Sequence, residues 1–231
     1  MLYDVTAVKA NIRNREGKRV FYQGENDRLT PSARDYLAQE RIAVLPASQA
    51  KPDRYRLPGG GYMETKPEHM THLNGDLLVP KTHPRIVFRG AIDTLEAELL
   101  LCQAACLPKL KAQLGEILDL TRKIIRWDVL EEPAQDMKLC GLTESEIRRR
   151  SHRPQEYYGI PHFMPSAEDK GAVLQLNRVR CAARQAELAG VAAFADSQGN
   201  VLRPDILQLL NRISSMLYIL MIQEKASGGE M

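Results

Sequence analysis

The chain has 231 residues, enough for one well-buried core and a smaller second unit. Its 32 lysines and arginines against 29 aspartates and glutamates give a formal net charge of +3. That near balance argues against a general nucleic-acid coat and still allows a local basic pocket. The longest uninterrupted apolar run, Met216 to Ile222, is too short to span a bilayer, so we expect no membrane span.

The first 70 residues predict a small mixed α/β extension that ends in a linker. Thr30 and Pro31 are typical of a helix start, and Leu37 and Ala38 supply its apolar face. The stretch IAVLP then reads as a strand that stops at its proline. Residues 47–69 are rich in proline, glycine and charge without periodicity, which predicts a linker or mobile loop. Their triple glycine lacks the spacing of a phosphate-binding loop.

The sequence from residue 71 to residue 231 predicts a helical bundle, and the helical periodicity begins near residue 85. A helix over residues 89–106 gathers its leucines on one face, and Pro108 ends it. A second helix, from about Lys109 to Asp128, repeats leucine and isoleucine at intervals of three and four. Two consecutive amphipathic helices of this length are typical of a bundle.

Four cysteines are scattered through the helical part, at positions 102, 106, 140 and 181. The N-terminus does not read as a secretory signal, so we expect reduced thiols in a cytoplasmic protein. Cys102 and Cys106 share a helix face, as a metal-binding pair would. Because no third and fourth ligand are evident nearby, buried core residues are the favoured interpretation.

The later helices have clear boundary signals. Thr143, with Glu146 three residues on, forms a capping box. Ser166 is expected to cap a long helix that runs into the 190s, and Pro204 to start the last helix after a turn at Gly199. We therefore expect a mainly α protein: a five-helix-type bundle over residues 71–231 behind the mixed α/β extension of residues 1–70.

Polar side chains form a stripe on the long helix. Arg180, Arg184 and Glu187 stand at i, i+4 and i+7, so they share one face. The ordinary interpretation is a solvated face with an arginine–glutamate pair, worth about 0.3–0.5 kcal/mol. The spacing also suits a polyphosphate, because guanidinium groups one turn apart bind its oxygens bidentately.

The last helix combines a strongly apolar face with a second polar stripe, formed by Asn211, Ser214, Ser215 and Tyr218. The ordinary interpretation is a packing seam of small residues whose hydroxyl groups bond back to the backbone. The alternative is a surface that contacts a polar ligand, because an asparagine amide can recognise a sugar or a base.

Three further residues complete the candidate pocket. Lys81 and Arg85 add positive charge just before the bundle, in the stretch PKTHPR. Asp93, near the expected start of the first helix, is ordinarily a favourable first-turn carboxylate, and it can also hold an arginine in place. A basic, partly desolvated pocket between helices is therefore a candidate ATP site without a phosphate loop.

Three segments resemble the PduO-type ATP:cob(I)alamin adenosyltransferases. Residues 81–99 are similar to the leading segment of that family, residues 178–187 to its R-x-x-x-R-x-x-E helix, and residues 209–220 to its LNRLSDYLF helix. The most similar branch is the EutT-type cobalamin adenosyltransferases of ethanolamine utilisation, through RLTPSAR near the N-terminus, THL at 71–73 and LRPDILQLLNR at 202–212. The resemblance covers most of the chain, with the motifs in the order of the family.

The resemblance implies a five-helix bundle with its active site between the subunits of a homo-oligomer, often a trimer. It implies ATP as a ligand, with Lys81 on the phosphates, Arg184 on the triphosphate and Asn211 on the nucleotide. Glu187 takes the acidic position of the family, where it helps to bind Mg²⁺ or to order the arginines. Arg180 would pair with Asp93 of a neighbouring subunit, which makes Arg184, Arg180 and Asp93 the expected catalytic set.

The reaction implied is transfer of the 5′-deoxyadenosyl group of ATP to cobalt(I) of cobalamin. Cobalt(I) is a strong nucleophile, so the protein must supply positioning and fixed positive charge rather than a general base. A dry pocket would also strip the lower axial ligand of the corrinoid, making cobalt(II) easier to reduce. Phe88, Trp127 and Phe163 are the candidate cobalamin-binding side chains.

The implied partners follow from that reaction. Besides ATP, Mg²⁺ and reduced cobalamin, they are a corrinoid reductase and the ethanolamine ammonia-lyase system, with no nucleic acid. The expected location is the cytoplasm, with a bacterial microcompartment as a site of association.

This chain departs from the family at two places. Some members of the ethanolamine branch bind a metal through a Cys-Cys-x-x-C cluster before the THL segment, and that region has no cysteine here. His69 and His72 alone make at most half of a tetrahedral site, so we expect no structural zinc or iron. The glycine-rich N-terminal loop of the family is also absent, and only Asn74-Gly75-Asp76 remains of it.

Two alternatives stay open at this point. One is a catalytically silent protein of the ethanolamine-utilisation system that binds ATP or a corrinoid, or that serves as a scaffold. The Asp-x-His-x-x-Gly signature of corrinoid carriers is absent, which counts against the carrier form. The other is a helical interaction protein whose basic segment, residues 147–153, docks onto an acidic partner, although such runs are usually solvated helix ends.

Overall fold

The computed structural model describes residues 1–15, 17–50, 55–135, 138–169 and 171–227. The chain divides into two compact units, Met1–Lys81 and Thr82–Met231. The division falls after Lys81 and not near residue 70, where the sequence placed it. The reason is a hairpin of two strands, β8 (Met70–Asn74) and β9 (Leu77–Pro80), which pairs with the sheet of the first unit through β9.

The first unit is built on a mixed sheet of seven short strands in the order β5-β3-β2-β7-β6-β9-β8. Beside β8 and β9, these strands are β2 (Arg13–Arg15), β3 (Lys18–Gln23), β5 (Ala43–Pro46), β6 (Tyr55–Arg56) and β7 (Tyr62–Met63). Two further strands, β1 (Leu2–Tyr3) and β4 (Arg28–Leu29), pair in parallel outside that sheet. A short 3₁₀ turn, η1, covers Ala47–Gln49.

Part of the stretch expected to be a linker is paired as strands. β6 and β7 are antiparallel across a turn that contains Gly60 and Gly61, whose φ angles are 85° and 82°. A Cβ atom at Gly61 would overlap the carbonyl oxygen of Ile12, so only glycine fits there. The sequence does not predict these strands, because each contains two residues and an alternating pattern needs more. Residues 51–54 of the same stretch lie outside the described residues.

Two helices, α1 (Val5–Asn11) and α2 (Pro31–Gln39), pack on a small separate core. Thr30 caps α2 as predicted, since its side chain accepts a hydrogen bond from the backbone of Ala33. Leu37 is buried as expected, but Ala38 is exposed and Ala33, one turn before Leu37, is the second buried residue. The buried members of this core are Val8, Phe21, Leu29, Ala33, Leu37 and Ile42.

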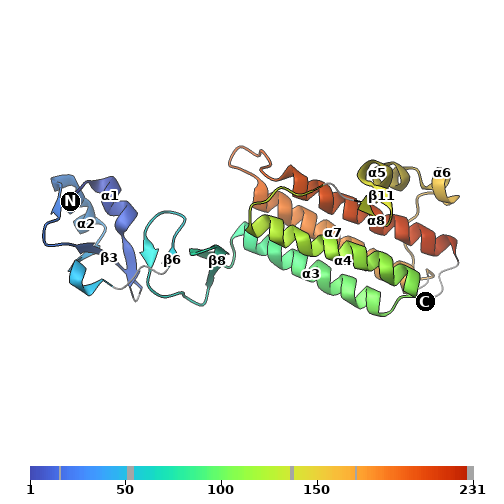
Figure 1. Ribbon diagram of the computed structural model, residues 1–231, viewed down its shortest axis with the longest axis horizontal. Coiled ribbons are helices and arrows are strands. Elements are labelled where there is room, and N and C mark those ends of the chain that lie inside the picture. Colours follow the sequence, from blue (N-terminus) through green and yellow to red (C-terminus); the bar gives the residue numbers. More distant parts are fainter. Residues whose placement is uncertain (16, 51–54, 136–137, 170, 228–231) are drawn as a thin grey trace. The chain divides into compact units, whose positions relative to one another are not determined.

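The second unit is a helical bundle, which confirms the mainly α class (Figure 1). Its four long helices lie alongside one another: α3 (Pro84–Ala104), α4 (Pro108–Val129), α7 (Gly171–Phe194) and α8 (Pro204–Ala226). The shorter α5 (Glu144–His152) and α6 (Pro154–Tyr158) pack against α8. A small hairpin of β10 (Lys138–Leu139) and β11 (Leu142–Thr143) precedes α5.

The helix boundaries agree with the sequence at two places and differ at two others. The capping box of Thr143 and Glu146 is present, and α8 begins at Pro204. Asp93 is not in a first turn, because α3 already begins at Pro84. Ser166 does not cap the long helix: its backbone N–H donates to Asp169 in a local turn, and α7 begins at Gly171.

The centre of the bundle is packed around α8, which is buried along most of its length from Ile206 to Ile222. By length and composition, α8 is the one described helix that could cross a membrane, but 67% of its most apolar window is buried inside the bundle. We assign it as a core helix. At one end of the core, Phe88 packs edge to face on Phe194. A Cβ atom at Gly190 would lie 2.8 Å from a methyl group of Leu207 and 3.3 Å from the ring of Phe88, so the helices pack closely there.

A buried ion cluster ties α3 to α4. The carboxylate of Asp128 is fully buried, and it lies 2.8 Å from a guanidinium nitrogen of Arg85 and 2.7 Å from one of Arg89. Removing one partner of such a cluster is costly, because it leaves a buried charge without compensation. Arg85, which the sequence offered as positive charge for a nucleotide, is instead engaged in the fold.

Candidate active site

Five of the seven residues of the predicted polar stripes on α7 and α8 line one cavity of about 390 Å³, and the other two are Glu187 and Asn211. We call it the arginine cavity. Its lining comes from α7, from α8 and from the segment before α7, and consists of Arg180, Arg184, Ser214, Ser215, Tyr218, His162, Phe163 and Met164. Because successive members of each stripe are one turn apart, the helical period alone brings them to one side of the helix. The serine stripe of α8 therefore borders a cavity and is not only a packing seam.

Among the residues that the structure describes, no acidic side chain lines the arginine cavity. Arg184 is exposed and forms no hydrogen bond or ion pair with any residue that the structure describes. The guanidinium of Arg180 lies 5.8 Å from the ring centroid of Tyr218, and its Nε atom is buried without a partner among the described residues. A buried donor without a partner is costly. Two uncompensated guanidinium groups facing one cavity are suited to bind an anion.

Tyr218 contacts the segment before α7, residues 162–164, which lines one side of the cavity. Its hydroxyl oxygen accepts a hydrogen bond of 3.1 Å from the backbone N–H of Phe163, and it lies 3.2 Å from Nδ1 of His162. The rings of Phe163 and His162 also stack on the tyrosine ring, with centroid distances of 5.9 Å and 5.8 Å respectively. Tyr218 thus fixes an apolar side chain, Phe163, at the edge of the arginine cavity.

Glu187 and Asn211 form a second polar contact between α7 and α8. The amide nitrogen of Asn211 donates to Oε1 of Glu187 over 2.9 Å. The stripe on α7 was expected to contain an arginine–glutamate pair, but the partner of Glu187 is this amide. On its other side, Asn211 accepts a hydrogen bond of 3.0 Å from Arg212.

Neither Lys81 nor Asp93 takes part in the contacts described above. Lys81 belongs to the first unit, where its ammonium group is 3.1 Å from the carboxylate of Glu68. Asp93 is exposed in the middle of α3, and no hydrogen bond or ion pair joins it to Arg180 within the described ranges. The single chain therefore gathers Arg180 and Arg184 in one cavity, with Glu187 and Asn211 joined by their own hydrogen bond.

The three aromatic candidates for cobalamin binding occupy different environments. Phe88 has no exposed surface, and its contact with Phe194 makes it part of the bundle core. Trp127 is 7% exposed and lines a separate cavity of about 440 Å³ beside α4. Phe163 alone of the three lines the arginine cavity. The full burial of Phe88 removes the surface that a corrinoid would contact.

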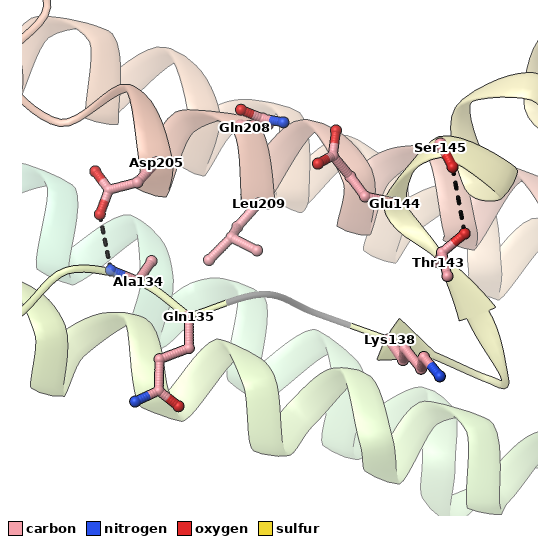
Figure 2. A pocket seen from close by; sticks show the side chains of 9 residues that line it. All are labelled: Ala134, Gln135, Lys138, Thr143, Glu144, Ser145, Asp205, Gln208 and Leu209. Carbon is pink, nitrogen blue, oxygen red and sulfur yellow. Dashed lines mark hydrogen bonds between the residues drawn. The ribbon is translucent and has the colours of Figure 1, made fainter.

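A larger cavity of about 720 Å³ lies between the start of α5, the start of α8 and residues that follow α4, among them Ala134 and Lys138 (Figure 2). Asp205 stands at one end, where its carboxylate accepts a hydrogen bond of 2.9 Å from the backbone of Ala134. Burial would raise the pKa of Asp205, but its hydrogen bonds from Arg203 and from the backbone outweigh that effect and lower the pKa to about 2. In the sequence, the signal for this residue is an acid in the first turn of the helix that begins at Pro204.

Metal ligands are sparse. Among the described residues, no group of three or more histidine, cysteine, aspartate or glutamate side chains could hold a metal ion. The Sγ atoms of Cys102 and Cys106 are 3.8 Å apart, and burial raises the pKa of the Cys102 thiol to about 12. These two residues are therefore a contact pair of protonated thiols at neutral pH.

Comparison with known proteins gives a consistent result. A sequence profile described as cobalamin adenosyltransferase matches residues 61–224. The chain is 31% identical to the corrinoid adenosyltransferase EutT of Salmonella typhimurium, over 94% of this chain and 90% of that protein. It is 29% identical to EutT of Escherichia coli, over 93% of this chain and 89% of that protein.

A solved structure shares the fold. It is a variant of the PduO-type ATP:corrinoid adenosyltransferase from Lactobacillus reuteri, complexed with cobalamin and ATP. The TM-score is 0.54 at 18% identity, and the match covers 70% of this chain and 91% of the other. At that identity the likeness concerns the fold alone.

Proposed function

This chain belongs to the cobalamin adenosyltransferase family, and we propose that it transfers the 5′-deoxyadenosyl group of ATP to cobalt(I) of a reduced corrinoid. The observation that carries the proposal is the arginine cavity, where two guanidinium groups face one cavity and none of its described lining residues is acidic. Fixed positive charge is what the reaction needs, since its leaving group is a polyphosphate.

The bond changes are simple. Cobalt(I) supplies an electron pair to C5′ of ATP, the C5′–O5′ bond breaks, and triphosphate leaves with the electrons of that bond. Arg180 and Arg184 would contact the triphosphate oxygens, stabilising the charge that gathers there. The hydroxyl groups of Ser214 and Ser215 and the amide of Asn211 would orient the nucleoside. No general base is required, because the nucleophile carries no proton to remove.

Two further groups would complete the phosphate site. Lys81 would bring its ammonium group to the phosphates, giving up its exposed pair with Glu68, which is worth little in water. Mg²⁺ commonly binds through one or two carboxylates together with substrate phosphates. Glu187 offers one carboxylate three residues after Arg184, which fits a metal ion that arrives with ATP. When bound, such an ion would neutralise phosphate charge.

Phe163 is the side chain that we assign to the corrinoid. It lies in the lining of the arginine cavity, and Tyr218 fixes it there through the backbone N–H and by stacking. The neighbouring Met164 is 90% exposed, which adds apolar surface at the same edge. An apolar group at this place would exclude the lower axial ligand of the corrinoid, so that cobalt(II) is reduced more easily. Trp127 lines another cavity, and we give it no such role.

A homo-oligomer would complete the site. α3 exposes Val87 and Leu101, and α7 exposes Leu174 and Leu188, in each case two heptads apart on one helical face. Leu101 and Leu188 are 63% and 68% exposed, so these faces carry apolar surface that a second copy would bury. Asp93 shares its face of α3 with the exposed Leu100, seven residues later, so burying that face against a second copy would bring Asp93 to another subunit. We propose that it there pairs with Arg180, in an assembly such as a trimer.

The physiological setting follows the relatives. The EutT proteins take part in ethanolamine utilisation, and we place this chain in the same process, supplying adenosylcobalamin to a lyase that depends on it. A corrinoid reductase would deliver the electron that makes cobalt(I). We expect this to occur in the cytoplasm, in association with a bacterial microcompartment.

The silent alternatives are not favoured. Relatives that match almost the whole chain are corrinoid adenosyltransferases, with no large part of their length missing here. The basic run at residues 147–153 is engaged locally: Arg150 lies over the ring of Tyr157 and 3.9 Å from Glu146. Such contacts are those of a solvated helix end.

An anaerobic assay tests the function. The purified protein is mixed with Mg-ATP and chemically reduced cobalamin, and the absorption spectrum is followed for light-sensitive adenosylcobalamin. We expect product well above the protein-free control. ATP binding without any product would contradict the proposal and indicate that the fold has been kept for a binding role.

A further inference from the structure

A chain of three hydrogen bonds connects α5 to the proposed nucleotide site. Glu144 at the start of α5 accepts from Nε of Arg212 over 3.1 Å. A second nitrogen of the same guanidinium donates to Oδ1 of Asn211 over 3.0 Å. The amide nitrogen of Asn211 then donates to Glu187 over 2.9 Å. These hydrogen bonds connect one residue of α5, two of α8 and one of α7 in sequence.

We infer that Glu144 and Arg212 are positioning residues of the ATP site, which act by fixing the amide of Asn211 and, through it, the carboxylate of Glu187. The inference rests on the proposed function, in which Asn211 contacts the nucleotide and Glu187 stands beside the phosphate-binding arginines. Asn211 and Glu187 lie one helical turn from Ser215 and Arg184, which line the arginine cavity. Glu144 and Arg212 do not line it either, and we expect them to act through the amide of Asn211.

The polarity of the chain allows one orientation of Asn211. Arginine has donors and no acceptor, and an ionised carboxylate has acceptors and no donor. The amide must therefore turn its oxygen toward Arg212 and its nitrogen toward Glu187. The opposite orientation would place NH₂ against the guanidinium and oxygen against the carboxylate. One N–H and one lone pair of the amide then remain, in fixed directions, for a nucleotide.

Burial and charge explain why Glu144 is needed. The Arg212 side chain is only 9% exposed in the middle of the most buried helix of the bundle. A charge at such a place must be compensated, and Glu144 is its ion-pair partner. A hydrogen bond from Gln208, followed by that from Arg212, lowers the pKa of Glu144, so it stays ionised at neutral pH.

Glu144 also lies at an accessible place. Its side chain is 41% exposed and lines the 720 Å³ cavity, where Figure 2 draws it beside Gln208 at the junction of α5 and α8. A substitution there can be made without opening the core. Glu144→Gln keeps the shape of the side chain and removes the charge that holds Arg212, so it is the variant of choice.

The test measures the dissociation constant of Mg-ATP by calorimetry on the full chain in its native assembly. We expect Glu144→Gln to weaken ATP binding about tenfold, the effect of losing one charge-assisted hydrogen bond. Glu156→Gln is the matched control, because Glu156 on α6 is exposed and its ion-pair partner among the described residues is Arg153, three residues before it. The control should bind ATP like the wild type.

A double-mutant cycle separates positioning from general damage. If Glu144 acts through Asn211, then Glu144→Gln has no further effect on ATP affinity once Asn211→Ala has removed the amide. Equal weakening in both backgrounds would overturn the inference, as would unchanged affinity in Glu144→Gln alone. Arg212→Lys keeps the charge but loses the fork, and should weaken ATP binding to the same extent as Glu144→Gln.

The result does not depend on turnover. If the wild type binds ATP and makes no adenosylcobalamin, the proposed function fails while the affinity cycle still tests the chain of hydrogen bonds. Thermal unfolding of each variant is recorded beside the titrations. If Glu144→Gln unfolds below the temperature of the titration, Arg212→Lys takes its place in the cycle with Asn211→Ala. The same two outcomes, equal weakening in both backgrounds or unchanged affinity, would then overturn the inference.

Discussion

Two pairs of arginines in this bundle have the same spacing and opposite surroundings. Arg85 and Arg89 on α3 are four residues apart, as are Arg180 and Arg184 on α7. The first pair shares the buried carboxylate of Asp128. The second faces a cavity whose lining, within the described part of the chain, contains no acidic residue. Spacing alone places two arginines on one helical face. Whether the pair stabilises the fold or is free to bind an anion depends on the residues of the helix that faces it.

The largest effect expected from this contrast is on turnover. Arg184→Ala should lower adenosylation by about 100-fold or more, the usual consequence of removing one donor to a developing charge. Its thermal midpoint should stay at the wild-type value, because Arg184 has no partner among the described residues to lose. Steady-state assays and calorimetry check both parts. A variant with normal turnover would remove Arg184 from the site.

The opposite result is expected at the other pair. Asp128→Asn leaves two arginines facing each other without a buried charge between them, and should lower the free energy of unfolding by about 3 kcal/mol. Urea denaturation measures the loss. Asp119→Asn, at an exposed position on the same helix, is the control and should change little. Equal effects of the two substitutions would show that the buried pair does not stabilise α3 against α4.

A smaller effect, with a defined pH dependence, is expected at the start of α8. The pKa of Asp205 is about 2 in the folded chain against a reference value of 3.8, because Arg203 and the backbone of Ala134 outweigh the burial that opposes them. A lowered pKa stabilises the fold above the unfolded value and loses that effect as the pH falls through the folded one. Asp205→Asn should therefore cost about 1–2 kcal/mol at pH 7 and much less near pH 2. A difference that stays constant between pH 7 and pH 2 would contradict this.

The sequence predicts part of the candidate site and misses the rest, as particular residues show. The helical period placed Ser214, Ser215 and Tyr218 on one face of α8, and the structure lines one cavity with them. The period could do this because it depends on one helix alone. It could not assign Arg85, because the partner of Arg85 is Asp128, which lies 43 residues away on another helix.

Other misses have equally local causes. The strands β6 and β7 contain two residues each, too few for any alternation to appear. Phe88 had the size of a corrinoid contact, but burial is decided by Phe194 and by the helix that faces it. Glu144 and Arg212 gave no signal as a pair, since 68 residues separate them. In each case the missing information was a tertiary neighbour.

The most direct measurement of the central claim is the binding of inorganic tripolyphosphate, the part of ATP that the arginines would hold. Titration of the wild type, Arg184→Ala and Arg85→Lys at one salt concentration compares the two arginine pairs. We predict that the wild type and Arg85→Lys bind with equal affinity and that Arg184→Ala binds at least about tenfold more weakly. Unchanged affinity in Arg184→Ala would contradict the assignment of the cavity between α7 and α8 as the polyphosphate site.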